Sequence, residues 1–275
     1  MIDVHCHSEY CPHARGGIEE YVNFAFKNRG IKIIGFSEHF PLPERFIDPA
    51  GDSAMKPESL EKYLNDIKAL KNPNVLAGIE VDFIPEYAKD IVKRLQKERF
   101  DYITGSIHFI DGWGFDFSED IFREGLKKNF NGNIERGISS YFGLLQGLIK
   151  LDVIDIVGHI DLIKKFNKDG RYFSEENPVY MKKVKETLEL AKERDLLIEV
   201  NTAGIDKMVG DIYPSRAILE MCYDLGMKLT LGSDAHAPEQ VGRYFGNALV
   251  RIKDIGYKEI YYIKGREVKG AEIAV

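Results

Sequence analysis

The stretch GIEEYVNFAFKNRGIKIIGFSEH, residues 17–39, contains the unit from which we predict the fold of this chain. Apolar residues recur in its first half at the spacing of an amphipathic helix, and a glycine follows that periodic run. Its second half, residues 31–39, is a short run rich in isoleucine, which is typical of a buried parallel strand. The unit ends on an acidic residue and a histidine, Glu38 and His39.

The same pairing of strand and helix recurs along the chain. Further apolar runs predict strands at 2–7, 74–83, 100–109, 153–161, 196–202 and 228–236. Residues 110–150 are expected to add helices beside the site, and the tail at 259–268 predicts an appended strand or short hairpin. Strand–helix alternation with right-handed crossovers closes into a barrel, so we predict an α/β fold. One domain, with seven barrel strands, is expected to span residues 1–275.

Composition excludes several classes of protein. A chain of 275 residues with 44% hydrophobic content is long enough for one barrel domain. The net charge of −6 argues against a nucleic-acid binder, which would usually carry a basic stripe. No run approaches the ~20 apolar residues of a membrane helix, and the first residues do not have the pattern of a signal peptide. Three cysteines form no disulfide framework, so a cytoplasmic location is expected.

The histidines follow the strands. Six of the seven lie at the carboxyl end of a predicted strand, namely His5, His7, His39, His108, His159 and His236, and His13 lies just beyond the first strand. Four acids share such positions: Glu80, Asp82, Asp161 and Asp234. In a barrel all these ends open onto one face, and barrel enzymes hold their chemistry on that face.

Successive side chains of the first strand are expected to point to opposite faces of the sheet. Asp3, His5 and His7 are expected to face the barrel mouth, and the apolar residues between them to pack against the outer helices: Ile2, Val4 and Cys6. Two imidazoles on one side suit a divalent metal ion. A lone histidine near a strand end is more often a hydrogen-bonded core residue. It is the collective placement that predicts metal, because clustered imidazoles and carboxylates need cations to hold them together.

The number of donors indicates two or three ions, with Glu80 as the expected bridging carboxylate. The cysteines are not expected to take part. Cys6 and Cys222 have the pattern of small buried hydrophobes, and Cys11 lies in a turn before a proline. The sequence contains no nucleophile elbow, Walker loop or dinucleotide fingerprint.

The motifs HCH (5–7), SEH (37–39), GSIHF (105–109), GHID (158–161) and GSDAH (232–236), with Glu80 between them, resemble the polymerase-and-histidinol-phosphatase (PHP) superfamily. The likeness keeps the motif order over nearly the whole chain. Within that superfamily, the amino-acid sequences of three stretches are most similar to the histidinol-phosphate phosphatases. These stretches are GSIHFIDGWGFD (105–116), DIVGHIDLIKKF (155–166) and EVNTAGIDK (199–207).

This resemblance implies a distorted (β/α)7 barrel with three divalent metal ions, which are manganese, iron or zinc. One ion would be held by His5, His7, Glu80 and Asp234. A second would share Glu80 and add His108 and His159, and a third would take His13, His39 and His236.

The activity implied is hydrolysis of L-histidinol phosphate by a hydroxide that two metals share. Glu80, Asp234 and His236 would be the catalytic residues, with Asp234 or His236 supplying a proton to the leaving group. Glu38 or Asp161 would orient metal ligands.

The partner expected is a small phosphorylated substrate. Candidate phosphate contacts are the basic residues Arg15, Arg171, Lys207 and Arg216. Lys207 follows NTAG where the family often has an arginine, and it would act as a point charge without the arginine fork. The loop at 110–116 offers Asp111, Trp113, Phe115 and Asp116 for the amine and the imidazole of the substrate, although the same loop could equally be a packed surface element.

Three alternatives remain open at this point. The chain could be a PHP phosphoesterase for another ester such as a nucleotide, an amidohydrolase-like enzyme that cleaves C–N bonds, or a protein with a structural metal cluster. No lysine ends a middle strand, which counts against the amidohydrolase reading. The sequence gives no prediction of oligomeric state.

Overall fold

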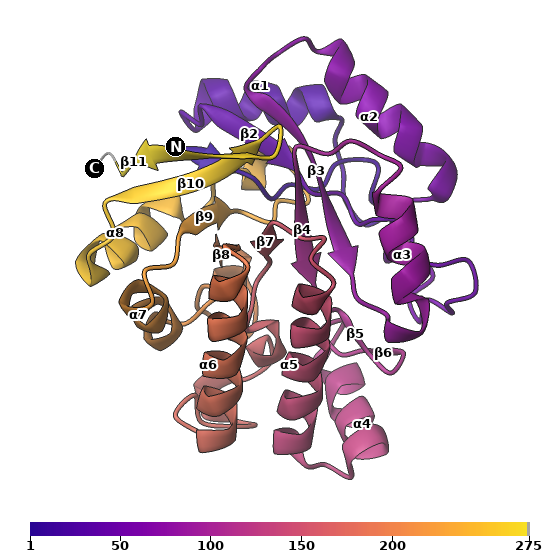
Figure 1. The fold of residues 1–275 in the computed structure, drawn as a ribbon, viewed down its shortest axis with the longest axis vertical. Helices are drawn as coiled ribbons and strands as arrows, with labels where there is room; N and C mark the ends of the chain where they lie inside the picture. The colour runs from indigo at the N-terminus through magenta and orange to yellow at the C-terminus, as the bar shows by residue number, and fades with distance from the viewer. Residues whose placement is uncertain (274–275) are drawn as a thin grey trace.

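Seven parallel strands make the centre of the molecule in the computed structural model, which describes residues 1–273 (Figure 1). They pair in the order β1-β2-β3-β4-β7-β8-β9, with bounds Ile2–Asp3, Ile33–Phe36, Val75–Asp82, Tyr102–Ser106, Ile156–Val157, Leu197–Asn201 and Leu229–Gly232. The two edges meet where Val4 N–H donates to the Leu231 carbonyl over 3.0 Å and Cys6 bridges Ala235 in parallel. The predicted seven-stranded barrel is therefore confirmed. Its strands are shorter than the apolar runs that predicted them.

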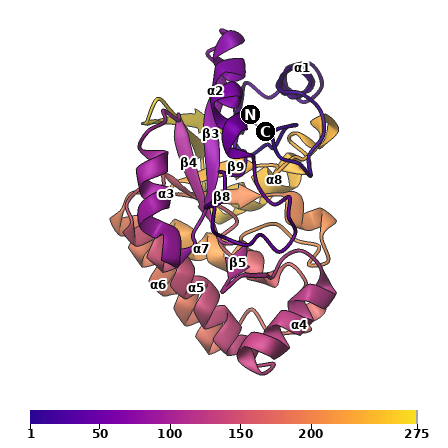
Figure 2. The same cartoon turned by 90° about the vertical axis from the view of Figure 1, so that its right-hand side faces the viewer.

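Eight helices in the described residues lie around these strands (Figures 1 and 2). They are α1 (Ile18–Asn28), α2 (Leu60–Ala69), α3 (Ala88–Leu95), α4 (Glu119–Phe130), α5 (Ile134–Lys150), α6 (Pro178–Glu193), α7 (Arg216–Asp224) and α8 (Phe245–Ile255). Short 3-10 turns interrupt the loops at Pro57–Ser59, Pro85–Tyr87, Leu162–Lys164, Lys168–Gly170, Ala203–Asp206 and Pro238–Gln240. Helices α4 and α5 confirm the prediction that residues 110–150 add helices, and α5 packs along α6 (Figure 2). No helix within residues 1–273 has the length and apolar character needed to span a bilayer.

Local sequence explains where these helices begin. Helix α6 starts with Pro178 in its first turn, and the Asn177 side chain accepts from the backbone N–H groups of Val179 and Tyr180. Helix α4 starts at Ser118, whose hydroxyl accepts from Ile121 N–H. Each cap satisfies backbone donors that have no partner inside the helix.

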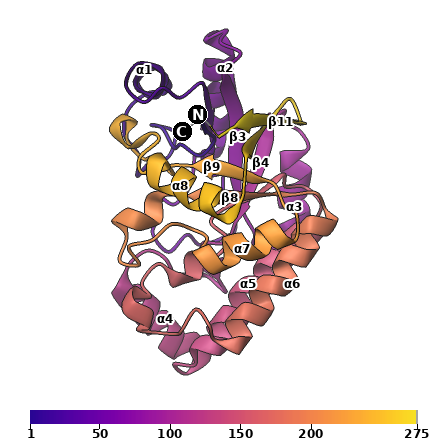
Figure 3. The same cartoon turned by 90° about the vertical axis from the view of Figure 1, so that its left-hand side faces the viewer.

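Two hairpins lie outside the seven-stranded sheet. Strands β5 (Phe109–Ile110) and β6 (Trp113–Gly114) form a short ribbon near the mouth of the barrel, and β10 (Glu259–Lys264) pairs with β11 (Glu267–Glu272) near the chain ends (Figure 3). The second hairpin confirms the prediction for the tail. Its Ile263 belongs to one apolar cluster with residues of four barrel strands and with Val4 after β1, so the hairpin covers the end of the barrel opposite the histidines.

The interior of that end is filled by Tyr102. Its ring packs with Leu76, Ile156 and Leu197, and its hydroxyl donates to the Val4 carbonyl over 2.6 Å. Because Tyr102 belongs to β4 and Val4 follows β1, the side chain crosses the barrel. It has room to cross because Gly35 and Gly78 face it without a side chain.

The expected alternation of the first strand is wrong at Asp3 and Val4, whereas His5 and His7 lie with the other histidines as expected. β1 ends at Asp3, and Val4 packs in the barrel interior with Tyr102 instead of against the outer helices. The Asp3 carboxylate accepts from the Ser233 hydroxyl over 2.6 Å and from the Gly242 N–H over 2.9 Å, so it braces loops and does not join the histidines. The period of two holds only while the chain is in regular strand geometry, and that ends here.

Replacing Gly78 with alanine is expected to destabilise the barrel. A Cβ at this position would lie 2.2 Å from Tyr102 Cζ, and Tyr102 is fully buried with no room to retreat. Overpacking of this kind costs about 3 kcal/mol in unfolding free energy, which urea denaturation would measure. Gly143→Ala in α5 is the matched control, because its Cβ would meet nothing within 4 Å. It should stabilise the protein by about 0.5–1 kcal/mol. Equal effects at the two positions would contradict this account of the barrel interior.

Candidate metal centre

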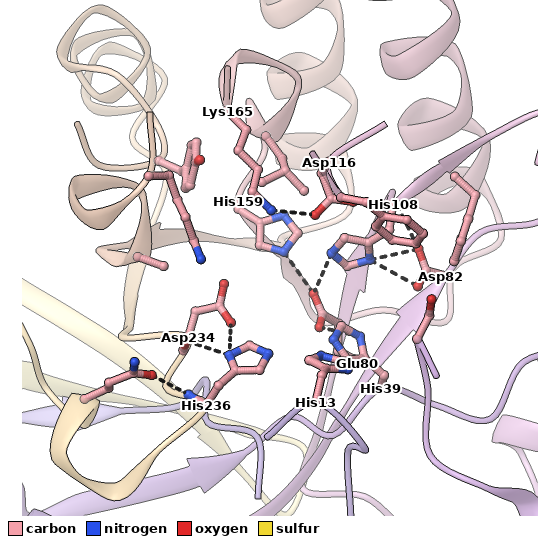
Figure 4. A pocket seen from close by; sticks show the side chains of 18 of the residues that line it. His13, His39, Glu80, Asp82, His108, Asp116, His159, Lys165, Asp234 and His236 are labelled. Carbon is pink, nitrogen blue, oxygen red and sulfur yellow. Dashed lines mark hydrogen bonds and ion pairs between the residues drawn. The ribbon is translucent and has the colours of Figure 1, made fainter. Parts of the chain in front are cut away.

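The histidines and acids singled out in the sequence converge at the carboxyl ends of the barrel strands, where a cavity of about 390 Å³ opens (Figure 4). His13, His39, His108, His159 and His236 line this cavity, together with Glu80, Asp82 and Asp234. His5 and His7 lie beneath them, 1% and 0% exposed. The rings of His7 and His39 stack with centroids 4.5 Å apart, as do those of His7 and His236. All seven rings therefore belong to one cluster.

Glu80 of β3 is the centre of this cluster. Its carboxylate lies 3.0 Å from His159 Nε2, 3.1 Å from His39 Nδ1 and 3.4 Å from His5 Nε2. His7 and His108 follow at 3.6 and 3.9 Å. Burial alone would raise the pKa of the Glu80 carboxyl, but these imidazoles hold the pKa well below its usual range. Glu80 is thus an ionised carboxylate shared by five rings.

Asp234 provides the second carboxylate, directly after β9. Its Oδ1 lies 3.4 Å from His7 Nε2 and 3.5 Å from His236 Nδ1. The residue has a φ of 50°, a left-handed conformation that is uncommon outside glycine and that a short acidic side chain tolerates. Although burial opposes ionisation, the surrounding histidines hold the pKa of Asp234 well below normal.

The nitrogen atoms of the cluster have the chemistry of metal ligands. His5 Nδ1 donates to Glu199 over 2.5 Å, so Nε2 is the nitrogen left to bind a metal, and it lies only 3.0 Å from His7 Nε2. Burial opposes the charged form of this ring, but Glu199, Glu80 and Asp234 raise its pKa, so a bound cation would take the place of a proton. Burial lowers the pKa of His39 well below its normal value, and burial and His7 lower the pKa of His236 to about 3. These two rings are therefore neutral and present lone pairs.

Three buried nitrogen and oxygen atoms that could ligate a metal have no hydrogen-bond partner within residues 1–273. They are Glu80 Oε2, His39 Nδ1 and His159 Nδ1. His39 Nδ1 and Glu80 Oε2 lie 3.1 Å apart, yet neither satisfies hydrogen-bond geometry toward the other. Unsatisfied buried polar atoms are costly, and a cation between them removes the cost. The donor set is nitrogen and carboxylate oxygen, which fits zinc, manganese or iron.

Four sets of these residues bring one ligand atom each within 4.8 Å of the others. They are His5–His7–Glu80, His5–His159–Asp234, His39–Glu80–His108 and His7–His39–His236. Glu80 belongs to two sets, as the expected bridge would. His39 belongs to one set with Glu80 and to another with His236. It therefore lies between the expected second and third ion sites. His13 lies beside them, with its ring centroid 4.9 Å from that of His236.

One carboxylate of the site was missed from sequence. Glu199 of β8 accepts from His5 Nδ1 with one oxygen and from the His159 backbone N–H with the other, the latter over 2.8 Å. It thereby ties the segment of His5 to the segment of His159. The available signal was an acid inside the apolar run 196–202, where a buried charge requires a partner.

Of the two acids expected to orient metal ligands, only one lies close to a histidine nitrogen. Glu38 lies within 4.8 Å of a His7 nitrogen and of Cys11 Sγ. Asp161 instead pairs with Lys164 over 2.8 Å, both side chains being fully buried, and accepts from Ser215 N–H over 3.0 Å. Asp161 therefore braces the wall of the barrel, and these contacts involve no histidine.

Of the four basic residues and the tryptophan predicted to contact the substrate, one lines the cavity and four lie outside its lining. Lys207 lines the cavity. Arg15, Arg171 and Arg216 lie outside its lining and pair with Glu239, Glu119 and Glu220. Trp113 is buried on Phe115 and Phe122, and its indole N–H donates to the Ile121 carbonyl over 2.9 Å. The structure therefore does not place Arg15, Arg171, Arg216 and Trp113 as the sequence predicted. The three arginines pair with acids, and Trp113 is part of the apolar core.

The remaining cavity wall is partly basic and partly apolar. Lys165 pairs with Asp116 over 2.9 Å, and Arg243 pairs with Asp206 over 2.8 Å. Asp116 is thus the member of the loop 110–116 that reaches the cavity (Figure 4). Phe109, Phe117, Leu162 and Tyr213 supply the apolar part.

Comparison with known proteins gives consistent results. The family model described as the PHP domain matches residues 3–203. A "Probable histidinol-phosphatase" of Deinococcus radiodurans is 32% identical over 95% of this chain and 96% of its own length. The histidinol-phosphatase of Bacillus subtilis is 32% identical over 87% and 95%. The crystal structure of a histidinol phosphate phosphatase from Lactococcus lactis, complexed with zinc, L-histidinol and phosphate, has a TM-score of 0.76, covers 98% of both chains and is 20% identical, which indicates a shared fold.

Proposed function

The chain belongs to the PHP domain family, and from that membership we propose that it is a metal-dependent phosphatase that hydrolyses L-histidinol phosphate to L-histidinol and phosphate. The observation that carries the proposal is the convergence of seven imidazoles with Glu80 and Asp234 at one cavity. The names of the relatives and the ligands of the Lactococcus lactis complex support the choice of substrate.

The metal ligands are proposed as the nine residues His5, His7, His13, His39, Glu80, His108, His159, Asp234 and His236. Glu80 is assigned to two of three ions, since it lies in two of the convergent sets. When bound, divalent cations supply positive charge to phosphoryl oxygens and lower the pKa of water towards ~7.

The chain's own groups would orient the substrate and move protons. His236 lines the cavity, and its Nδ1 lies 3.1 Å from the Asp234 carbonyl oxygen. Its ring is therefore held at the rim beside the Asp234 carboxylate. Because the His236 ring is neutral and Asp234 is ionised, these groups would relay a proton from water to the departing alkoxide oxygen of histidinol. Glu199, which contacts the His5 ring and the His159 backbone, keeps these ligands in place.

Recognition of the substrate is assigned to the cavity wall. Lys207 and Arg243 are placed to contact phosphate oxygens. Asp116 is the carboxylate available to the substrate amine, and its present partner Lys165 would have to share it. Phe109 and Phe117 offer apolar surface for the imidazole.

Lys207→Gln is expected to raise the KM for L-histidinol phosphate about tenfold with a smaller change in kcat, because it removes one charged hydrogen bond to phosphate. Steady-state kinetics would measure both constants. Arg15→Gln is the control, because Arg15 is exposed and pairs with Glu239 outside the cavity. An equal rise in KM for the control, or no rise for Lys207→Gln, would remove Lys207 from the binding site.

The proposed function is tested by phosphate release from L-histidinol phosphate beside common monoesters such as nucleotides and sugar phosphates, with metal content measured on the same sample. The expected result is a clear preference in kcat/KM for L-histidinol phosphate. A nucleotide as the preferred ester would overturn the substrate, and metal-loaded protein that cleaves no ester would overturn the reaction.

We also propose that residues 1–275 form one domain. The family model ends at residue 203, but Asp234 and His236 lie beyond it and reach the same cavity, which supports a single unit. A reducing compartment such as the cytoplasm fits the three cysteines, which are free thiols.

A further inference from the structure

Cys11 lies directly beneath the histidine cluster. Its side chain is fully buried, and its Sγ is 3.5 Å from His7 Nδ1. The backbone N–H of His39 donates to the same sulfur over 3.2 Å. The turn that follows His7 fixes this position, since Cys11 N–H donates to the Ser8 carbonyl over 2.9 Å. Cys11 thus contacts two of the histidine-bearing segments.

Glu38 is the next polar group beyond the sulfur. One of its carboxylate oxygens, Cys11 Sγ and a His7 nitrogen all lie within 4.8 Å of one another. Oε1 accepts from the Ser8 backbone N–H over 2.8 Å and from the Ser8 hydroxyl over 2.5 Å. Oε2 is buried without a partner among residues 1–273. A buried carboxylate oxygen requires a donor, and the thiol proton of Cys11 is a weak donor close by.

We propose that Cys11 is a positioning residue for His7. Its sulfur accepts the proton of His7 Nδ1–H, and Glu38, one of whose carboxylate oxygens lies within 4.8 Å, is the acid beside the thiol. The His7 ring then keeps its proton on Nδ1 and leaves the Nε2 lone pair for a cation shared with Glu80 and Asp234, whose oxygens lie 3.6 and 3.4 Å from Nε2. This inference rests on the proposed metal centre, and it is independent of which ester is hydrolysed.

The neighbouring ligands support this arrangement. A metal-binding histidine usually donates its second ring N–H to a carboxylate or carbonyl, which fixes its tautomer. His5 has Glu199 in that place at 2.5 Å, and His108 has Asp82 at 3.0 Å. For His7 the corresponding place is taken by a sulfur, with the carboxylate of Glu38 one step further away. A thiol is a weaker acceptor, so the effect of removing it should fall at the low end of the usual range.

The test begins with zinc-loaded wild-type protein. Long-range ¹H–¹⁵N spectra of the histidine rings, with His7 assigned by its loss in His7→Gln, are expected to show a slowly exchanging Nδ1–H proton for His7. In Cys11→Ala we expect this proton to exchange faster with water and zinc to bind about tenfold more weakly in a competition with a chelator. Cys11→Ser should restore much of both properties, because a hydroxyl can also accept and donate. Cys222→Ala is the matched control, since Cys222 is equally buried but lies in α7.

Three results would overturn the proposal. They are an Nε2–H tautomer for His7 in the zinc-loaded wild type, a folded Cys11→Ala variant with unchanged exchange of the His7 ring proton and unchanged zinc affinity, and a sulfur-to-cobalt charge-transfer band in cobalt-loaded wild type that Cys11→Ser lacks. The last would make Cys11 a metal ligand. If Cys11→Ala does not fold, the wild-type spectrum and Cys11→Ser still decide. Failure to cleave histidinol phosphate would leave all these readings unchanged, so it is a separate outcome.

Discussion

Removal of divalent metal with a chelator is expected to abolish phosphate release from L-histidinol phosphate, and addition of zinc or manganese is expected to restore it. The cavity wall carries Glu80, Asp82, Asp116 and Asp234. Of its three basic residues, Lys165 and Arg243 are already paired with carboxylates, which leaves Lys207. Without bound cations, the remaining positive charge lies on imidazoles such as His108, which Asp82 and Glu80 already neutralise, so little of it is left for a phosphate dianion. The loss of several kcal/mol of charge stabilisation corresponds to a fall in kcat/KM of roughly 10³-fold or more.

The metal-free protein should remain folded but unfold at a lower temperature. The apolar core around Tyr102 lies at the other end of the barrel from the histidines and does not depend on metal. At a free metal concentration about 1,000 times Kd, binding adds about 4 kcal/mol to the unfolding free energy. Calorimetry and metal analysis on the same samples would measure this, with a zinc-saturated chelator as the control. Full activity in protein without metal would contradict the proposed centre.

The barrel and its histidine rim were predictable because both depend on local pattern. Buried parallel strands require apolar runs, and chain direction alone places every strand end on one face. That is why His39, Glu80 and Asp234, far apart in sequence, were expected together. The exact extent of each strand was less accessible. The run 153–161 predicts a long strand, yet only Ile156–Val157 forms one. The Gly158 N–H still donates to the Gly105 carbonyl, and the chain then turns at His159, whose carbonyl accepts from Leu162 N–H.

Most of the errors concern contacts between distant segments. Arg15 and Arg171 have the charge of phosphate ligands, but each pairs with an acid from a distant part of the chain. Arg216 instead pairs with Glu220 one turn further along α7. Glu199 was missed because its role depends on His5, almost two hundred residues away in the sequence. Val4 faces inward and packs with Tyr102, whose hydroxyl donates to the Val4 carbonyl. Apart from Arg216–Glu220, none of these pairings leaves a period in the sequence, so pattern alone could not predict them.

Glu80→Gln is expected to have the largest effect of any single substitution in the site. Glutamine has nearly the same size, so packing is kept while the negative charge shared by five imidazoles is lost. Removing one partner of a buried ionic cluster costs about 3–5 kcal/mol, which is roughly 10²- to 10³-fold in metal affinity. Because Glu80 belongs to two convergent sets, bound metal should fall by more than one ion per chain, and phosphate release should fall with it.

Two further variants separate this effect from a general loss of acidity. Glu86→Gln, on the exposed segment after the same strand, should leave metal content and kcat/KM unchanged. Asp82→Asn, whose carboxylate contacts His108, should weaken metal binding by about 10–100-fold, which is less than the loss at Glu80. Elemental analysis and zinc competition would rank the three variants. If Glu80→Gln kept the metal content of the wild type, Glu80 would not be a bridging ligand, and the cluster would have to be assigned around Asp234 instead, where His5, His7, His159 and His236 also converge.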